Sequence, residues 1–260
     1  MTRRGLIIGT SHSAALRLAW KQWSGERPAM ALDFAALHGG MADFQVMGQT
    51  LTGRLDANRQ TLLRFTGQAS FDLGCYDFIA LCGGTTSSFH AVRLYLAARW
   101  PGLPSAALPL DPGVALLSGR CFQAALIGQI RSASAYPLLT ALHDSGTTAR
   151  LYAIPLPALS HAALTISKHH QGFVQLRRNG DHAAMAAVLH TASVMAYAGL
   201  ATYVPPPQAV RKDHFFTRAR FRRGATRLGT DDAIPQPLDD FLHGNADYGR
   251  HILTGLAALL

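Results

Sequence analysis

The stretch Leu6-Ile7-Ile8-Gly9-Thr10-Ser11-His12-Ser13 decides the fold that the sequence predicts. Its three consecutive large apolar residues are typical of a short strand that is buried on both faces of a sheet. Gly9 ends this strand, and a helical pattern over residues 14–23 follows almost at once. A buried strand that leads directly into a helix is the beginning of a β–α–β unit with parallel strands.

The same alternation of short apolar runs and helical patterns continues along the chain. The further predicted strands are residues 32–37, 78–82, 151–154 and 201–204. The clearest further predicted helices are residues 88–100, 183–200 and 245–260, the last with Asn245 as its N-cap. We therefore expect one doubly wound α/β domain over residues 1–260, flavodoxin-like, with a mostly parallel five-stranded sheet and helices on both faces in three layers.

Two segments do not follow this alternation and are predicted to be insertions. Residues 44–54 have the pattern of an extended segment or hairpin. Residues 101–128 contain Pro104, Pro109 and Pro112, which predict a long irregular excursion.

Composition and charge limit the class of protein. With 48% hydrophobic and 15% charged residues, the chain of 260 residues can bury a large core and is not disordered. Its 24 Lys+Arg against 15 Asp+Glu give a net charge of +9, which suits nucleic acid, an anionic membrane surface or an acidic substrate. Charge alone does not choose among the three.

The sequence contains no segment that we expect to direct or anchor the chain to a membrane. Only three apolar residues precede Gly9, whereas a secretory signal needs roughly 7–15, and no run approaches the ~18 of a spanning helix. Cys75, Cys82 and Cys121 lack the number and spacing of a disulfide framework or a zinc site. We expect a cytoplasmic protein without a metal ion.

The loops that follow the strands are the expected place for chemistry, because ligands bind at the carboxyl ends of parallel strands. Ser11 lies between the first strand and the first helix, where backbone N–H groups and the helix dipole stabilise an oxyanion. The alternative is that Ser11 or Ser13 only caps the helix. No phosphate-binding glycine motif follows any strand, so we expect no nucleotide cofactor, and no other cofactor.

A second informative stretch lies near the carboxyl terminus, where Asp240 precedes His243 by three residues. One turn can place the carboxylate against Nδ1 of the imidazole and leave Nε2 free to act as a base. This spacing is common in proteins and indicates little by itself.

Taken together, these stretches resemble the SGNH/GDSL hydrolases. The resemblance is to bacterial members with a Gly-Asn-Ser-His start and an Asp-x-x-His-x-Asn-x-x-Tyr-Gly end. Residues 240–249 (DFLHGNADYG) fit that ending at every specified position, and residues 9–11 resemble the start. Residues 155–157, 203–207 and 213–216 also look like this subgroup, so the resemblance spans about the whole chain.

The resemblance implies a catalytic triad with Ser11 as nucleophile, His243 as general base and Asp240 as the carboxylate that orients it. It also implies oxyanion donors at Ser11, at Gly39 or Gly40, and in the third glycine-rich block, at Gly84 and Thr85. The implied activity is esterase or acyl transfer on a small acyl ester, including an acylated carbohydrate. His12 is a rival base by adjacency, although a neighbouring helical position points about 100° away.

Two departures from the family pattern motivate an alternative function. Thr85 stands where the family usually has Asn, and Thr10 replaces the usual Asp or Asn before the serine. A lost oxyanion donor costs on the order of 10²–10³ in rate. A catalytically weak binding protein that kept the fold is therefore the alternative.

A basic run near the carboxyl terminus supports a third, less favoured possibility. Its arginines are Arg218, Arg220, Arg222, Arg223 and Arg227, interleaved with Phe215, Phe216 and Phe221. Phosphate contacts need such charge and bases stack on aromatic rings, which would suit nucleic acid. No recognisable binding module accompanies the run, so we favour an anionic substrate near the Asp240–His243 pair.

Overall fold

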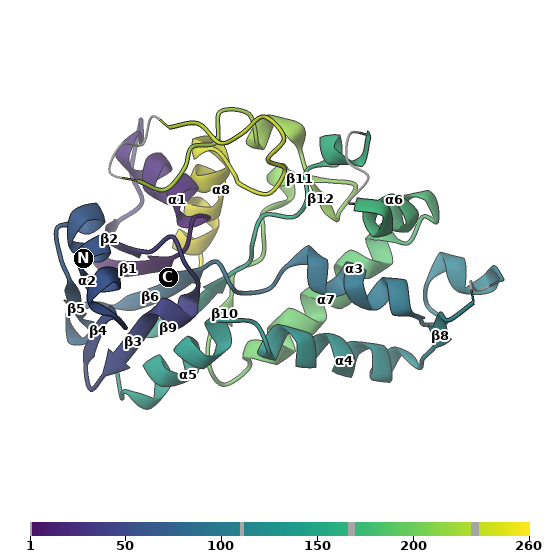
Figure 1. Ribbon diagram of the computed structural model, residues 1–260, viewed down its shortest axis with the longest axis horizontal. Helices are drawn as coiled ribbons and strands as arrows, with labels where there is room; N and C mark the ends of the chain where they lie inside the picture. The colour runs from purple at the N-terminus through teal and green to yellow at the C-terminus, as the bar shows by residue number, and fades with distance from the viewer. Residues whose placement is uncertain (1, 110–111, 166–169, 230–233) are drawn as a thin grey trace.

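A five-stranded parallel sheet forms the centre of the fold, as the sequence predicts (Figure 1). The computed structural model describes residues 2–109, 112–165, 170–229 and 234–260. In sheet order the strands are β10 (Thr202–Tyr203), β9 (Arg150–Ile154), β6 (Phe78–Cys82), β1 (Arg3–Gly9) and β2 (Met30–Ala36). Every neighbouring pair is parallel, and Gly9 is in register with both Cys82 and Ala36. The carboxyl ends of β1, β2 and β6 therefore lie level at one edge.

Alternate residues of β1 enter different hydrophobic clusters, as expected for a strand covered on both faces. Ile7 packs with residues of α1 (Ser13–Lys21) and α8 (Ala246–Ala257), which cover one face of the sheet (Figure 1). Leu6 and Ile8 belong to the larger cluster on the other face, to which α5 (Ala135–Asp144) contributes. The sheet and its two helical layers make the three-layer α/β/α fold.

Further helices pack against one another beside the sheet and extend to the right in Figure 1. They are α3 (Ser88–Ala97), α4 (Gly119–Arg131), α6 (Gln171–Arg178) and α7 (His182–Tyr197). The buried carboxylate of Asp181, just before α7, accepts hydrogen bonds from the Tyr95 hydroxyl on α3 and from the backbone and hydroxyl of Ser105. This fully buried acid joins three segments, a structural role rather than a catalytic one.

The predicted elements agree with the structure to within a few residues. The strand predicted at 78–82 has the same bounds as β6, and the final helix begins after Asn245, whose side chain accepts a hydrogen bond from the Tyr248 N–H at 3.0 Å. The helix predicted over 88–100 ends at Ala97, because Ala98–Arg99 form the short strand β7. β7 pairs with β8 (Ala115–Leu116).

The insertion predicted at 44–54 is a hairpin. β3 (Phe44–Met47) and β4 (Thr50–Gly53) are antiparallel, and β5 (Ser70–Asp72) adds a third strand after α2 (Asp56–Thr66). A second, smaller hairpin pairs β11 (Arg211–Lys212) with β12 (Phe216–Thr217).

The prediction of an irregular segment over 101–128 is wrong from Gly119 onward, where α4 begins. All three prolines of the segment precede this helix, so they do not oppose it. The Ser118 hydroxyl caps α4 by accepting a hydrogen bond from the Cys121 N–H at 3.2 Å. Residues 110 and 111 of the predicted insertion lie outside the described part.

Among the described residues, no helix is both long enough and apolar enough to cross a membrane.

Close contact between α1 and α8 brings the two ends of the chain together, and it depends on Gly249. A Cβ atom at this position would lie 2.1 Å from the carbonyl oxygen of Ala15. Gly249→Ala must therefore push the helices apart, and we expect it to lower the free energy of unfolding by about 2 kcal/mol. Urea unfolding measures this change.

Gly255→Ala, later in the same helix, is the matched control. Its Cβ would have an ordinary contact of 3.5 Å with Pro207 Cγ. Alanine favours a helix over glycine by about 1 kcal/mol, so this variant is expected to be neutral or slightly more stable. Equal destabilisation by both substitutions would contradict the close α1–α8 contact.

Candidate active site

Ser11 lies directly beyond the carboxyl end of β1, in the turn before α1. The Thr10 N–H donates a hydrogen bond to the Cys82 carbonyl of β6 at 3.2 Å, and the Gly9 carbonyl accepts one from the Leu37 N–H after β2 at 3.1 Å. The turn is thus held to both neighbouring strands. This fixes the position of the serine relative to the loops that follow β2 and β6.

The structure does not favour a simple capping role for the serines. α1 has no side-chain hydrogen bond at its N-cap. The buried hydroxyl of Ser13 instead donates to the Thr10 carbonyl at 2.7 Å. The Ser11 hydroxyl lies 2.9 Å from Nε2 of His243.

Ser11, His243 and Asp240 form a continuous hydrogen-bonded series, although the serine and the histidine are at opposite ends of the chain. Nδ1 of His243 lies 2.5 Å from Oδ2 of Asp240, while Nε2 faces the serine. The carboxylate fixes the imidazole tautomer with the proton on Nδ1, which leaves Nε2 able to accept the serine proton. The structure therefore brings together the three predicted catalytic residues.

Local turn chemistry holds Asp240 in place. Its Oδ1 accepts hydrogen bonds from the backbone N–H groups of Leu242 at 2.7 Å and of His243 at 3.2 Å. Burial alone would raise the pKa of Asp240, but the hydrogen bond with His243 and the charges of His243 and Arg222 lower it below its ordinary value. The carboxylate stays ionised beside the imidazole.

Asn245 joins this segment to the preceding basic loop. Its Nδ2 donates hydrogen bonds to the carbonyls of Arg220 and Arg223, both at 2.9 Å, while its Oδ1 caps α8. One amide side chain therefore fixes the direction in which the chain leaves His243 and enters the helix. This explains why an asparagine stands two residues after the histidine.

Arg222 is a site residue that the sequence did not reveal. Its side chain is only 6% exposed, and its Nη2 lies 2.9 Å from Oδ1 of Asp240. Within the described residues, its Nε and Nη1 have no hydrogen-bond partner. Burial lowers the pKa of Arg222 to about 10, against the raising effect of the Asp240 charge. The Asp240 carboxylate therefore contacts both the buried guanidinium of Arg222 and the imidazole of His243.

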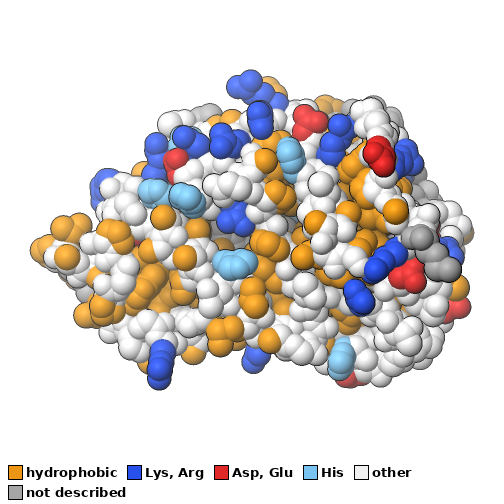
Figure 2. Space-filling view, turned by 180° about the vertical axis from the view of Figure 1, so that it is seen from behind, with side chains coloured by type: hydrophobic (Ala, Val, Ile, Leu, Met, Phe, Trp, Pro, Cys, Tyr) orange, Lys and Arg blue, Asp and Glu red, His pale blue; other side chains and the backbone are white. Residues whose placement is uncertain are grey.

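The remaining arginines of the basic run behave as expected for a solvated loop. Arg218, Arg220, Arg223 and Arg227 are exposed. Lys and Arg side chains gather along the upper part of the back face, where acidic ones are few (Figure 2). Phe215, Phe216 and Phe221 are buried, so their rings are not available to stack on bases. The expectation that these rings stack on nucleic-acid bases is therefore not supported.

The ring of His12 stacks on the imidazole of His243. The ring centroids of His12 and His243 are 4.4 Å apart with 15° between the planes. Nδ1 of His12 is buried and has no hydrogen-bond partner among the described residues. Burial, with smaller contributions from the charges of His243 and Arg222, lowers the pKa of His12 to about 3. The ring is therefore neutral near pH 7 and limits how His243 can tilt.

We expect His12 to make stability depend on pH. The unfolded chain binds a proton at His12 as the pH falls through about 6.5, whereas the folded chain does so only near 3. The contribution of neutral His12 to stability is therefore fully present above pH 6.5 and is lost as the pH falls towards 3. The loss is at most about 1.4 kcal/mol per pH unit.

Urea unfolding at several pH values between 7 and 4 tests this expectation. His12→Phe, which keeps a ring for stacking, should flatten the decline in stability. His143→Phe, at an exposed position, is the matched control and should keep the wild-type slope. Parallel slopes for wild type and His12→Phe would contradict the depressed pKa.

The predicted oxyanion loops follow the two strands that flank β1. Gly39 and Gly40 are exposed after β2, and Gly84 follows β6 with a φ of +61°, a conformation that suits glycine. Within the described part of the chain, the N–H groups of Ser11, Gly39, Gly40 and Gly84 donate no hydrogen bond to a backbone carbonyl. The predicted oxyanion donors therefore have no backbone acceptor of their own.

Thr85 contributes differently from the prediction. It is buried, and its hydroxyl donates a hydrogen bond to the Ile154 carbonyl at 2.5 Å. This hydrogen bond uses the single hydroxyl proton to connect the loop after β6 with the end of β9, so the hydroxyl does not donate to an oxyanion in this arrangement. Thr10 is also buried, and a Cβ at Gly83 would lie 2.2 Å from its Oγ1, so these loops pack closely.

Within the described residues, no group of three or more His, Cys, Asp or Glu side chains could hold a metal ion. None of the three cysteines forms a disulfide bond. Cys75 and Cys121 are exposed, whereas Cys82 is buried, and burial raises the pKa of its thiol to about 12.

Comparison with known proteins assigns neither a family nor a function to the chain. No protein-family model matches the chain, and no curated protein matches it. A solved structure of a DUF4886 family protein from Bacteroides uniformis is similar, with 13% sequence identity and a TM-score of 0.37. The alignment covers 100% of this chain and 83% of that one.

Proposed function

We propose that the protein is a serine esterase or acyltransferase that acts on small acyl esters through Ser11, His243 and Asp240. The observation that carries this proposal is the pair of contacts on one imidazole, 2.9 Å from Nε2 to the serine oxygen and 2.5 Å from Nδ1 to the carboxylate. These contacts supply the three roles of a nucleophile, a base and an orienting acid. The resemblance of residues 9–11 and 240–249 to SGNH hydrolases supports the same assignment.

In the proposed first step, Nε2 of His243 takes the hydroxyl proton as the Ser11 oxygen attacks the ester carbonyl carbon. The carbonyl oxygen becomes negatively charged and accepts hydrogen bonds from the N–H groups of Ser11, of Gly39 or Gly40, and of Gly84. The protonated imidazole then donates its proton to the leaving alkoxide, and the C–O bond of the ester breaks. An acyl group remains on Ser11.

In the second step, Nε2 takes a proton from water as the water oxygen attacks the acyl-serine. The bond between the acyl carbon and Ser11 Oγ then breaks, the imidazole returns the proton to Oγ, and a carboxylic acid is released. A sugar hydroxyl in place of water would give acyl transfer. Asp240 stabilises the imidazolium in both steps, and His12 limits its tilt. The exposed arginines of the loop that Asn245 joins to this segment favour an ester with a negative charge nearby, including an acylated anionic carbohydrate.

Hydrolysis of a panel of acyl esters tests the proposal. The panel contains p-nitrophenyl acetate, butyrate and hexanoate, with acetylated neutral and acidic sugars, each measured at low and high salt. We expect turnover that Ser11→Ala removes, and faster turnover of acidic than neutral sugar esters at low salt. Equal activity of wild type and Ser11→Ala would rule out Ser11 as the nucleophile, and no activity with any ester would favour a binding protein.

A further inference from the structure

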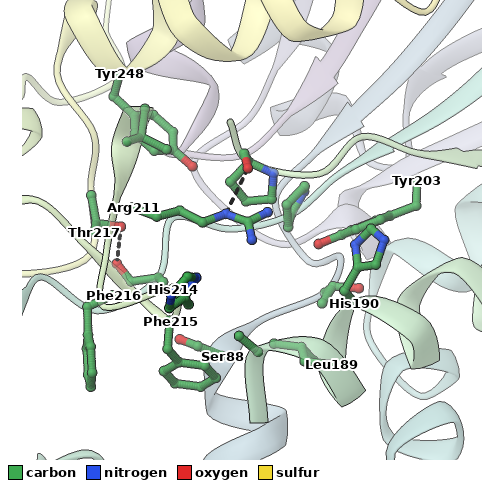
Figure 3. A pocket seen from close by; sticks show the side chains of 16 residues that line it. Ser88, Leu189, His190, Tyr203, Arg211, His214, Phe215, Phe216, Thr217 and Tyr248 are labelled. Atoms are coloured by element: carbon green, nitrogen blue, oxygen red, sulfur yellow. Dashed lines mark hydrogen bonds between the residues drawn. The ribbon is translucent and has the colours of Figure 1, made fainter. Parts of the chain in front are cut away.

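A second pocket lies at the same edge of the sheet, at the carboxyl ends of β9 and β10. Its cavity volume, counted as space for the centres of water-sized spheres, is about 60 Å³; it is partly open to solvent, and no triad residue lines it. Its walls come from the ends of β9 and β10, from α7 and from the β11–β12 hairpin (Figure 3). The back face is hollowed near its middle, where basic and histidine side chains lie among hydrophobic ones (Figure 2).

Arg211 points into this pocket from the start of the hairpin (Figure 3). Its Nε donates a hydrogen bond to the Pro206 carbonyl at 2.8 Å, which fixes the plane of the guanidinium. Among the residues that the structure describes, its two terminal nitrogens make no hydrogen bond, so both can bind a planar anion. Asp213, the nearest acid in sequence, is paired with Lys212, Arg177 and His161.

Tyr248 provides an independent indication of a ligand. The residue is 2% exposed, and its buried hydroxyl has no hydrogen-bond partner in the described structure. Figure 3 shows this hydroxyl on the side of the pocket where the Arg211 guanidinium lies. A buried donor without a partner is unfavourable, and an acceptor atom bound in the pocket would satisfy it.

The rest of the lining is mainly apolar, with the hydroxyl groups of Thr86, Ser88, Tyr203 and Thr217 and two imidazoles as further polar groups. Leu189 and Phe215 form apolar walls, and His190 and His214 add further nitrogen atoms. No acidic residue is part of the lining. The pocket therefore combines a positive charge, an unused hydroxyl donor and apolar surface, which suits a small anion with an apolar body.

We propose that this pocket binds a small organic carboxylate with a short apolar chain. The carboxylate lies against the terminal nitrogens of Arg211 and accepts a hydrogen bond from the Tyr248 hydroxyl, and the chain contacts Leu189 and Phe215. This site is separate from the triad, and the proposal does not depend on the proposed esterase activity.

Isothermal titration calorimetry of the purified chain with butyrate, hexanoate and octanoate tests the proposal. We expect saturable binding of at least one carboxylate, and binding of hexan-1-ol that is at least about tenfold weaker, because the alcohol cannot pair with the guanidinium. Binding of the alcohol as tight as that of hexanoate, or no carboxylate binding, would overturn the proposal.

Variants locate the bound carboxylate. Arg211→Gln is expected to weaken binding by about tenfold or more, and Tyr248→Phe by about three- to tenfold. Arg220→Gln, at an exposed position outside the pocket lining, is the control and should leave the affinity unchanged. Equal losses of affinity in Arg211→Gln and Arg220→Gln would indicate a nonspecific effect of charge and would contradict binding at Arg211.

Two further variants test whether the carboxylate binds in this pocket rather than at the triad, and whether a loss of binding reflects misfolding. Leu189→Trp fills the pocket without changing charge, so it should abolish binding in a chain with a wild-type circular dichroism spectrum. Ser11→Ala should bind hexanoate as the wild type does. Loss of binding in Ser11→Ala, or full binding in Leu189→Trp, would place the carboxylate elsewhere.

Discussion

Ser11→Ala is expected to lower the rate of ester hydrolysis by about 10⁴-fold or more, which is the usual loss when a triad nucleophile is removed. The only hydroxyl in contact with Nε2 of His243 within the described residues is that of Ser11. Without it, no acyl-enzyme forms, and residual turnover depends on the oxyanion donors and direct attack by water.

Ser132→Ala is a suitable control for this experiment. Ser132 is exposed, and its hydroxyl donates a hydrogen bond only to the nearby Gln129 carbonyl at 2.8 Å. It should retain wild-type turnover and stability. Steady-state kinetics with the best ester of the panel measures the turnover rate of both variants. A similar decrease of the rate in both would contradict the assignment of Ser11 as the nucleophile.

Arg222→Met is expected to give the second large effect, a loss of about 3 kcal/mol in the free energy of unfolding. Removing one partner of a buried ion pair leaves the other charge without compensation. The Asp240 side chain is 13% exposed and, among the described residues, would keep only His243 and two backbone N–H groups as partners. Turnover should decrease as well, because the carboxylate that orients His243 is then less well fixed.

Arg223→Met is the matched control, because this neighbouring arginine is exposed. A surface substitution is expected to change the free energy of unfolding by less than about 0.5 kcal/mol. Arg222→Lys keeps the charge but not the planar guanidinium, so it should restore part of the stability. Urea unfolding measures all three. Equal stability of Arg222→Met and Arg223→Met would contradict the buried pair with Asp240.

The central sheet could be predicted because its strands carry a local signal. β6 is a continuous apolar run with Gly83 and Gly84 after it, and its predicted bounds agree with the structure. α4 could not be recognised in the same way, since the prolines before Gly119 suggested that the irregular segment continued. The cap provided by Ser118 was the missed signal.

The candidate site shows the limit of sequence reasoning more clearly. The contact between Ser11 and His243 joins residues that are 232 positions apart, so spacing alone could not predict it; the resemblance to a family suggested it. Arg222 was hidden because it stands among arginines that are exposed, and only the folded chain buries it. The second pocket was equally hidden, because Arg211 and Tyr248 belong to segments with no common pattern.

The positive charge now has a more specific meaning than the composition gave it. One arginine of the basic run is buried against the triad carboxylate, others lie on the surface beside it, and Arg211 points into the second pocket. Local burial, rather than net charge, decides what each arginine does.

Labelling with a fluorophosphonate, followed by mass spectrometry of the digested protein, tests the central claim most directly. The reagent reacts with a serine that a neighbouring base activates. We predict one phosphonylated residue, Ser11, and no labelling in Ser11→Ala or His243→Ala. Labelling of another residue, or an unreacted Ser11 in correctly folded protein, would contradict the assignment of the triad.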